Sequence, residues 1–167
     1  MNKYIFASAN KNKILEISKE LMNIKLLSLS DIGYFEEIVE SGLTLKENAL
    51  IKSQTIYDKY NIPTISDDTG LEVDALGGIP GVFSARYAGK EADANSNIRK
   101  LLKEMCGCKD RRARFRTIIC LKNHKKEKFF EGLVEGCITN KAFGNNGFGY
   151  DPIFMPNGYK KTFAQLS

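Results

Sequence analysis

The chain has 167 residues, of which 43% are hydrophobic and 27% charged, and its formal net charge is +5. These proportions are typical of a globular protein with one substantial core, so we expect a single domain over residues 1–167. No window holds the roughly 18 apolar residues of a membrane-spanning helix, and the apolar run near the N-terminus is too short for a signal peptide. We therefore expect a cytoplasmic protein with no membrane partner.

The four cysteines do not indicate a secreted or zinc-binding protein. They are Cys106, Cys108, Cys120 and Cys137. A chain of this size needs no disulfides to fold, and no secretory segment accompanies them. Their spacing, even with His124 added, matches no standard zinc site. We expect reduced thiols.

Hydrophobic spacing in the first 60 residues predicts strands that alternate with helices. The elements expected in chain order are a strand over 4–8, a helix over 12–22, a strand over 25–29, an irregular acidic segment over 31–42 and a helix over 45–60. Thr44 and Glu47 are spaced as a capping box at the start of the second helix. The residues that share one face of this helix are Leu45, Ala49, Lys52 and Ile56.

The rest of the chain predicts a sheet with one further helix. The apolar run over 62–65 predicts a strand that stops at a turn, Asp67-Asp68-Thr69-Gly70. The elements expected after this turn are a continuation of the sheet over 71–76, a loop over 77–81, a helix over 93–105, strands over 114–122 and 128–138 joined as a hairpin, a glycine-rich loop over 143–152 and a strand over 153–155. Together these elements predict an α/β protein.

Asp67 and Asp68 allow two interpretations. Paired carboxylates at the edge of a sheet provide hard oxygen ligands for a hydrated divalent cation, which makes metal-assisted chemistry the first hypothesis. Acidic residues before a glycine are also common in turns and caps, where their role is structural. The pair by itself leaves both interpretations open.

Ser8, Asn10 and Lys13 lie where the first strand is expected to meet the first helix. The amides of a helix N-terminus attract anions, and Lys13 would add a positive charge to a bound phosphate. The alternative is a capped helix start with exposed lysines. Glu40 and Lys52 supply a further acid and cation, so the chain holds what phosphoryl chemistry needs: oxygen ligands for Mg²⁺ and cations for phosphate oxygens.

The loop Gly147-Phe148-Gly149-Tyr150-Asp151 brings aromatic and acidic side chains together. Phe148 and Tyr150 are suited to stacking on a nucleobase, and Asp151 is suited to accepting a hydrogen bond from an exocyclic nitrogen or a sugar hydroxyl. The alternative is a structural glycine turn with two core aromatic residues. This segment also leaves both interpretations open.

Five motifs follow one another along nearly the whole chain. They are Ser-x-Asn-x-x-Lys at 8–13, Glu-Ser-Gly-Leu-Thr-x-x-Glu-Asn-Ala at 40–49, Ser-Asp-Asp-Thr-Gly-Leu at 66–71, Gly-Gly-x-Pro-Gly-x-x-Ser-Ala-Arg-Tyr at 77–87 and Gly-Phe-Gly-Tyr-Asp-Pro-Ile-Phe at 147–154. In this order they resemble the inosine triphosphate pyrophosphatase family. The resemblance implies an elongated, two-lobed mixed α/β fold with a nucleotide cleft between the lobes, and a homodimer. It also implies Mg²⁺-dependent hydrolysis of ITP, dITP or XTP to the monophosphate and pyrophosphate.

The resemblance implies roles for individual residues. Glu40 and Asp68 would coordinate Mg²⁺, and Asp68 would also accept the proton of the attacking water, with Asp67 in support. The residues expected to bind the substrate are Ser8, Asn10, Lys13, Lys52, Asp67 and Thr69 at the triphosphate, and Phe148, Gly149, Tyr150 and Asp151 at the nucleoside. The expected ligand is a purine nucleoside triphosphate, and we expect no binding of nucleic acid.

The family pattern continues beyond the position of Ser167 into a lysine and a Ser-His-Arg motif that contacts the purine. The sequence ends at Ser167, so we expect a C-terminally shortened domain. A catalytically impaired nucleotide-binding protein is the alternative that this departure suggests. A third interpretation, an RNA-binding module that uses the basic segment 111–116, is favoured only by charge.

Overall fold

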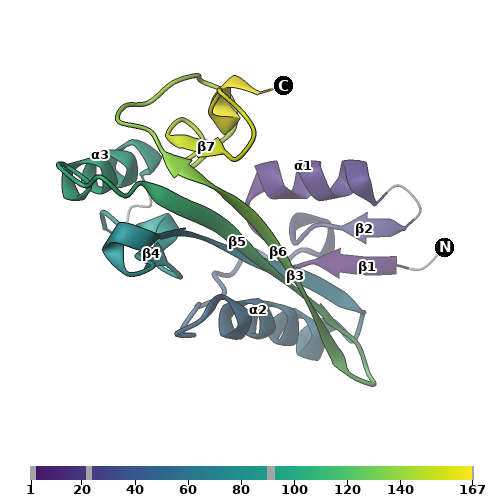
Figure 1. Ribbon diagram of the computed structural model, residues 1–167. Coiled ribbons are helices and arrows are strands. Elements are labelled where there is room, and N and C mark those ends of the chain that lie inside the picture. The colour runs from purple at the N-terminus through teal and green to yellow at the C-terminus, as the bar shows by residue number, and fades with distance from the viewer. Residues whose placement is uncertain (1–2, 22–23, 90–92, 167) are drawn as a thin grey trace. The chain divides into compact units, whose positions relative to one another are not determined.

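The structure is a computed structural model that describes residues 3–21, 24–89 and 93–166 (Figure 1). The chain divides into two compact units. The first unit comprises Met1–Asp68 and Ile118–Glu131, and the second unit comprises Thr69–Thr117 and Gly132–Ser167. The three strands that contribute residues to both units are β3 (Thr64–Val73), β5 (Arg112–Lys122) and β6 (Glu127–Ile138). Helices and a mixed sheet are present, so the α/β class is confirmed.

The first unit is built around parallel strands. Its other elements are β1 (Lys3–Phe6), α1 (Lys11–Glu20), β2 (Lys25–Leu27), the 3₁₀ turn Ser30–Ile32 and α2 (Leu45–Tyr60). Strand β1 pairs in parallel with β2 on one side and with β3 on the other, and Figure 1 shows α1 and α2 on opposite sides of β1 and β2. Ile5 and Phe6 point to opposite faces of β1, and both are fully buried because both faces are covered.

Helix α2 has the extent and the buried face that the sequence predicts. The hydroxyl of Thr44 accepts from the Glu47 amide at 3.1 Å, and the Glu47 carboxylate accepts from the Thr44 amide at 3.2 Å, which completes the capping box. The buried residues of α2 are Leu45, Asn48, Ala49, Lys52, Ser53 and Ile56. Ile56 packs in the core of the first unit with Ile5, Ala7, Leu29 and Tyr34. A lysine within this face is not explained by packing alone.

The second unit combines an antiparallel sheet with one helix. Its other elements are the 3₁₀ turns Asp74–Leu76, Ser84–Arg86 and Phe163–Gln165, β4 (Pro80–Gly81), α3 (Ala94–Glu104) and β7 (Phe154–Pro156). Strand β4 pairs with β3, and β7 pairs with β6. The predicted inward face of α3 is confirmed, because Ile98, Leu101 and Met105 are buried and Leu102 packs beside them. They form a core with Leu71, Val73, Ala113, Ile138, Tyr150, Ile153 and Phe154.

The prediction that a strand stops at the acidic pair is wrong. Strand β3 runs without interruption from Thr64 to Val73, through Asp67, Asp68 and Gly70. The turn preference of these residues is outweighed by pairing with neighbouring strands and by burial along the strand. The chain turns later, at the 3₁₀ turn Asp74–Leu76, where a strand was expected to continue.

The segment over 77–81 is not a loop throughout, because Pro80–Gly81 form the short strand β4, which pairs with β3. The boundaries of the other predicted helices and strands lie within one or two residues of the observed ones. Helix α1 ends at Glu20, and Met22, where we expected its last residue, lies outside the described residues. The expected hairpin turn is present, and in it the Asn123 amide donates to the Lys126 carbonyl at 3.1 Å. Within the described part of the chain, no helix is long and apolar enough to cross a membrane.

Candidate functional site

Asp67 and Asp68 point to opposite faces of β3, because consecutive side chains of a strand alternate. Asp67 contacts Lys13 of α1, with Oδ2 2.5 Å from Nζ. Asp68 contacts Lys52 of α2, with Oδ1 3.2 Å from Nζ. The two aspartates are only 4% and 8% exposed. The continuous strand therefore gives two adjacent buried carboxylates separate cationic partners on separate helices.

Lys52 lies between two carboxylates. Its Nζ is 3.1 Å from Oε1 of Glu40 and 3.2 Å from Oδ1 of Asp68, and the whole residue is 8% exposed. Glu40 precedes α2, Lys52 lies on α2 and Asp68 lies on β3, so three parts of the first unit converge here. Burying charges costs desolvation free energy that their mutual attraction only partly repays. We therefore treat the cluster of Glu40, Lys52 and Asp68, here called the charged cluster, as the candidate site.

The charged cluster shifts the pKa of its two buried members. Burial raises the pKa of Asp68 above that of an ordinary aspartate, and the nearby Glu40 raises it further, against the opposing effect of Lys52. Burial acts to lower the pKa of Lys52, but attraction to Asp68 and Glu40 outweighs it, so the net shift is upward. Lys52 therefore stays charged, while Asp68 becomes a stronger base than an ordinary aspartate.

Asp68 and Glu40 of the charged cluster can each supply an oxygen ligand to Mg²⁺, but they do not form a complete coordination shell. Oδ2 of Asp68 is buried and has no hydrogen-bond partner among the described residues. Among the residues that the structure describes, no three acidic, histidine or cysteine side chains gather around one point. Mg²⁺ in nucleotide enzymes is typically held by one or two carboxylates together with substrate phosphates, which is the donor set that Asp68 and Glu40 offer.

The loop between β1 and α1 places Ser8 and Asn10 at the N-terminus of α1. Oδ1 of Asn10 accepts hydrogen bonds from the amides of Asn12 and Lys13, at 3.0 and 3.4 Å, so Asn10 is the N-cap. Oγ of Ser8 accepts from the Asn10 amide at 3.2 Å. The capped-helix interpretation is therefore correct for Asn10, but Lys13 is not an exposed lysine, because it pairs with Asp67. The expected triphosphate contacts of this loop stay a prediction.

The predicted site residues are divided between the two units. The first unit brings together Lys13 with Asp67, Glu40 and Lys52 with Asp68, and Ser8 with Asn10. The second unit holds Thr69 and the loop over 147–151. Oγ1 of Thr69 lies 2.9 Å from Oγ1 of Thr117, so its hydroxyl has a partner on β5.

A hydrogen bond to the carboxylate of Asp151 holds the loop over 147–151 in shape. The Phe148 amide donates to Oδ2 of Asp151 at 2.8 Å. Gly147 has a φ of 74°, and a Cβ there would lie 2.1 Å from the same oxygen, so only glycine fits. Tyr150 is buried in the core, whereas Phe148 is partly exposed. Phe148 is therefore the aromatic residue of this loop whose ring is open to a base.

Asn48 is a residue of the candidate site that the sequence interpretation missed. It is fully buried on α2, and its Oδ1 accepts from the Gly42 amide at 2.8 Å, two residues after Glu40. Its Nδ2 is buried and finds no hydrogen-bond partner in the part of the chain that the structure describes. The signal was its spacing, because position 48 falls between Leu45 and Lys52 on the predicted buried face. Asn48 holds the segment that presents Glu40 to the charged cluster.

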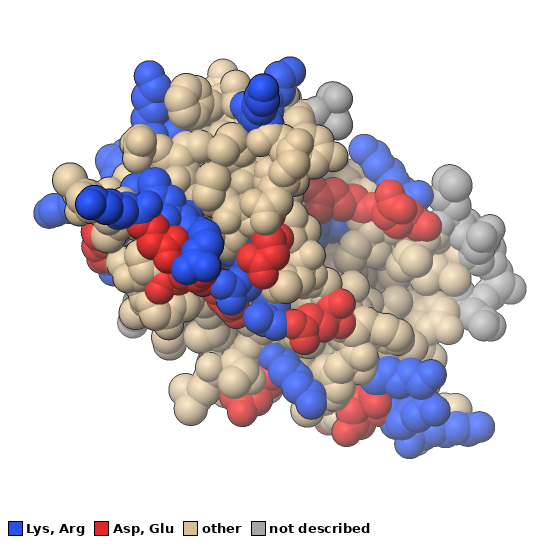
Figure 2. Space-filling view, viewed as in Figure 1, with Lys and Arg blue, Asp and Glu red and all other residues tan. Residues whose placement is uncertain are grey.

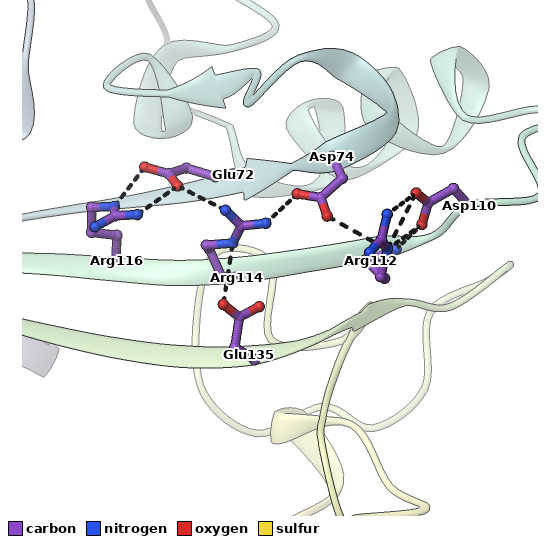
Figure 3. Close-up of polar contacts among 7 residues, drawn as sticks. All are labelled: Glu72, Asp74, Asp110, Arg112, Arg114, Arg116 and Glu135. Atoms are coloured by element: carbon purple, nitrogen blue, oxygen red, sulfur yellow. Dashed lines mark hydrogen bonds and ion pairs between the residues drawn. The ribbon is translucent and has the colours of Figure 1, made fainter.

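The basic segment over 111–116 is neutralised within the second unit (Figure 3). The contacts drawn are Arg112 with Asp110 and Asp74, Arg114 with Glu72, Asp74 and Glu135, and Arg116 with Glu72. Arg111 donates to the backbone carbonyls of Ile138 and Thr139, at 2.6 and 2.8 Å. On the face shown in Figure 2, many Lys and Arg atoms lie beside Asp and Glu atoms, whereas those at the top of the view do not. The charge that favoured RNA binding is therefore engaged by carboxylates and carbonyls.

Comparisons with known proteins support the motif-based resemblance. The sequence model of the Ham1 family matches residues 4–167. A dITP/XTP pyrophosphatase from Flavobacterium psychrophilum is 52% identical over 164 residues, which are 98% of this chain and 86% of the relative. Two solved structures are also similar: the Ham1 protein of Staphylococcus aureus (TM-score 0.90, 40% identity, 99% of this chain and 87% of that one) and a HAM1 protein of Coxiella burnetii (TM-score 0.92, 36% identity, 100% and 88%). The chain therefore belongs to the Ham1 family.

Proposed function

We propose that this chain is an Mg²⁺-dependent pyrophosphatase that hydrolyses the non-standard purine nucleoside triphosphates ITP, dITP and XTP. The observation that carries the proposal is the charged cluster, in which a buried oxygen of Asp68 has no hydrogen-bond partner among the residues described. Such a cluster is costly to bury, and it supplies oxygen ligands and a cation side by side, as phosphoryl chemistry requires. The name dITP/XTP pyrophosphatase, borne by the relatives, supports the substrate class.

Asp68 is the proton acceptor in this proposal. Water attacks the α-phosphorus and forms a new P–O bond, while the bond from that phosphorus to the oxygen that bridges the α- and β-phosphates breaks. Pyrophosphate leaves with the bridging oxygen, the monophosphate keeps the water oxygen, and the proton of the water passes to Asp68. The raised pKa of Asp68 favours this transfer. Lys52 is proposed to supply positive charge to the phosphate oxygens, and so is Lys13, which pairs with Asp67 but whose charge also acts to lower the pKa of Asp68.

Glu40 and Asp68 are the residues that we propose hold Mg²⁺. The bound ion would neutralise phosphate charge and lower the pKa of a coordinated water. The support for this assignment is the Asp68 oxygen, which has no hydrogen-bond partner within residues 3–21, 24–89 and 93–166, and the partly exposed carboxylate of Glu40. Lys52 keeps both carboxylates in place through its two ion pairs.

Further residues are assigned to the substrate because their motifs match the family. Ser8, Asn10, Thr69 and Asp67 are proposed at the triphosphate, with Asp67 acting through Lys13. At the nucleoside, Phe148 is proposed to stack on the base, and Gly149 to present its backbone. Tyr150 and Asp151, which the family motif also assigns to the nucleoside, are proposed to contribute to its pocket by holding the loop, since the first is buried in the core and the second accepts from the Phe148 amide.

We also propose that the chain works as one catalytic domain, as a homodimer and in the cytoplasm. The span of the family match, from residue 4 to residue 167, supports the single domain. The homodimer rests on the family resemblance, and light scattering of the purified protein measures it directly. The cytoplasmic location follows from the substrate class, because nucleoside triphosphate pools lie there.

Pyrophosphate release with Mg²⁺ tests the proposed function. We expect the protein to release pyrophosphate from ITP, dITP and XTP with kcat/KM at least about tenfold above that for ATP and GTP, a modest degree of discrimination for an enzyme pocket. The assay compares all five substrates at equal concentration, with a chelator control. Tight binding of ITP without release of pyrophosphate would instead support the catalytically impaired alternative.

Gly42→Ala is expected to displace the segment that carries Glu40. A Cβ at position 42 would lie 2.6 Å from Oδ1 of Asn48 and 2.7 Å from Cβ of Glu47, so the backbone must move. We expect kcat/KM for ITP to fall about tenfold, because small displacements of catalytic groups are costly. Gly132→Ala is the control, since a Cβ there has nothing within 4 Å. Equal activity of the two variants would contradict the role given to the Glu40 segment.

A further inference from the structure

Tyr150 ties the loop over 147–151 to a distant part of the second unit. Its hydroxyl donates to the carbonyl of Ser84 at 2.9 Å, and its ring is buried in the core. Its own carbonyl accepts from the amides of Ile153 and Phe154, at 2.9 and 3.1 Å. The loop is therefore fixed from inside the core through one side-chain hydrogen bond.

Ser84 is held firmly against β3. Its Oγ accepts from the amide of Leu71, a β3 residue, at 2.8 Å and donates to the carbonyl of Gly81 at 2.6 Å. Ser84 is buried, so these bonds do not compete with water. The carbonyl that receives the Tyr150 hydroxyl thus has a fixed position.

Asn97 of α3 reinforces the same carbonyl. Its Nδ2 donates to the carbonyls of Ser84 and Ala85, at 3.4 and 3.0 Å, and its Oδ1 accepts from the amide of Ala88 at 2.6 Å. Asn97 is 4% exposed, so its amide is available only to these backbone groups. A buried side chain that uses both ends of its amide on one segment fixes the path of that segment.

Two further side chains of α3 contact the same segment at Tyr87. Asn97, Lys100 and Glu104 are spaced three and four residues apart and share one face of the helix. Lys100 donates to the carbonyl of Tyr87 at 2.7 Å, and the hydroxyl of Tyr87 donates to Glu104. Tyr87 therefore lies on the same segment as Ser84, but it makes no hydrogen bond to Tyr150 among the described contacts.

We propose that Asn97 and Ser84 are positioning residues for the nucleoside loop, which act through the hydroxyl of Tyr150 and set nucleotide affinity without touching the substrate. The inference rests on the proposed function in one respect: the loop over 147–151 binds the nucleoside. Phe148 stacks on a base with higher affinity if its loop is already ordered, because ordering the loop during binding would cost free energy. The hydrogen bond of the Tyr150 hydroxyl orders the loop before the nucleotide binds.

Tyr150→Phe tests the hydrogen bond from the Tyr150 hydroxyl to the Ser84 carbonyl, here called the anchor. The substitution removes the hydroxyl and keeps the buried ring. A lost neutral hydrogen bond corresponds to a KM for ITP that is higher by about three- to tenfold, with kcat within about twofold of wild type. Hydrogen exchange of the Phe148 amide, followed by NMR without nucleotide, should become faster by a similar factor. Asn97→Asp should produce the same pattern, since it loses both donated bonds and keeps the acceptor for Ala88.

Tyr87→Phe is the matched control, because it also removes a tyrosine hydroxyl, one that lies on the segment of Ser84 and donates to Glu104 instead of to the Ser84 carbonyl. We expect it to leave KM and the exchange of the Phe148 amide unchanged. In the double variant of Tyr150→Phe and Asn97→Asp, the rise in KM should be smaller than the product of the single effects, since both act on one carbonyl.

Two results would overturn the anchor. One is unchanged exchange of the Phe148 amide in Tyr150→Phe, and the other is an equal effect of Tyr87→Phe. A wild-type protein that hydrolyses no nucleoside triphosphate would overturn the proposed function instead, and the exchange measurement still decides on the anchor in that case.

Discussion

Asp68→Asn is expected to abolish turnover and to leave nucleotide binding largely intact. The substitution keeps the size of a side chain that is 8% exposed, and it keeps an oxygen that can accept from Lys52. It removes the negative charge and the basic oxygen, so the attacking water has no proton acceptor. Loss of a general base costs about 10²–10⁴ in rate. We expect kcat at the lower limit of detection and a dissociation constant for ITP within about threefold of wild type, because the binding cations remain.

Isothermal titration with ITP and a pyrophosphate-release assay measure the two quantities on the same preparation. Asp58→Asn is the matched control, since Asp58 is an exposed acid on α2 that contacts only Gln54 among the described contacts. It should leave both quantities unchanged. Turnover of Asp68→Asn at the wild-type rate would remove Asp68 from the mechanism.

Lys52→Met is expected to destabilise the protein as well as to inactivate it. The variant leaves Asp68 buried without its cation, next to the carboxylate of Glu40. Breaking a buried ion pair from one side costs about 3–5 kcal/mol, and the partial exposure of Glu40 brings our expectation to about 2–4 kcal/mol of unfolding free energy. Urea denaturation at pH 8 measures this loss. Turnover should fall by at least about 10², because one of two phosphate-binding cations is gone.

The stability loss in Lys52→Met should shrink as the pH falls. Burial and Glu40 raise the pKa of Asp68 in the folded protein above its unfolded value, so folding disfavours the charged form of this carboxyl. The resulting penalty is present above the folded pKa and disappears as the pH falls towards the unfolded value. Without Lys52 the penalty grows, so the difference between variant and wild type is largest at pH 8. Lys59→Met, which removes an exposed lysine from the same helix, should show little change at any pH.

The sequence predicted helix α2 fully because its signals are local. A capping box marks its start, and apolar residues at helical spacing mark its buried face. Lys52 is the one charged residue among the buried residues of this helix, and the structure shows why: its partners are Asp68 and Glu40. Capping and helical spacing therefore predicted both the helix and the position of Lys52 on its buried face.

The same local rules failed at the acidic pair. Asp67, Asp68 and Gly70 favour a turn when only neighbours in sequence are considered. The strand continues through the pair because β3 lies between β1 and β5 in the sheet and pairs with β4 at Leu71 and Glu72, and pairing with segments distant in sequence leaves no local signal. With the turn assumed, the alternation that sends Asp67 to Lys13 and Asp68 to Lys52 could not be derived.

Asn48, Ser84 and Asn97 were missed for a related reason. Each makes its contacts with backbone groups of another segment, and residue type alone does not show which buried polar side chain has such partners. The motif at 77–87 contains Ser84, but its role depends on Tyr150, which follows 66 residues later. Only the folded chain brings these groups together.

The position of bond cleavage tests the central claim most directly. ITP is incubated with the protein and Mg²⁺ in water enriched in oxygen-18, and the products are analysed by mass spectrometry. Attack at the α-phosphorus predicts IMP and pyrophosphate, with the heavy oxygen in IMP and none in pyrophosphate. IDP and inorganic phosphate as products, or heavy oxygen in the pyrophosphate, would contradict the mechanism.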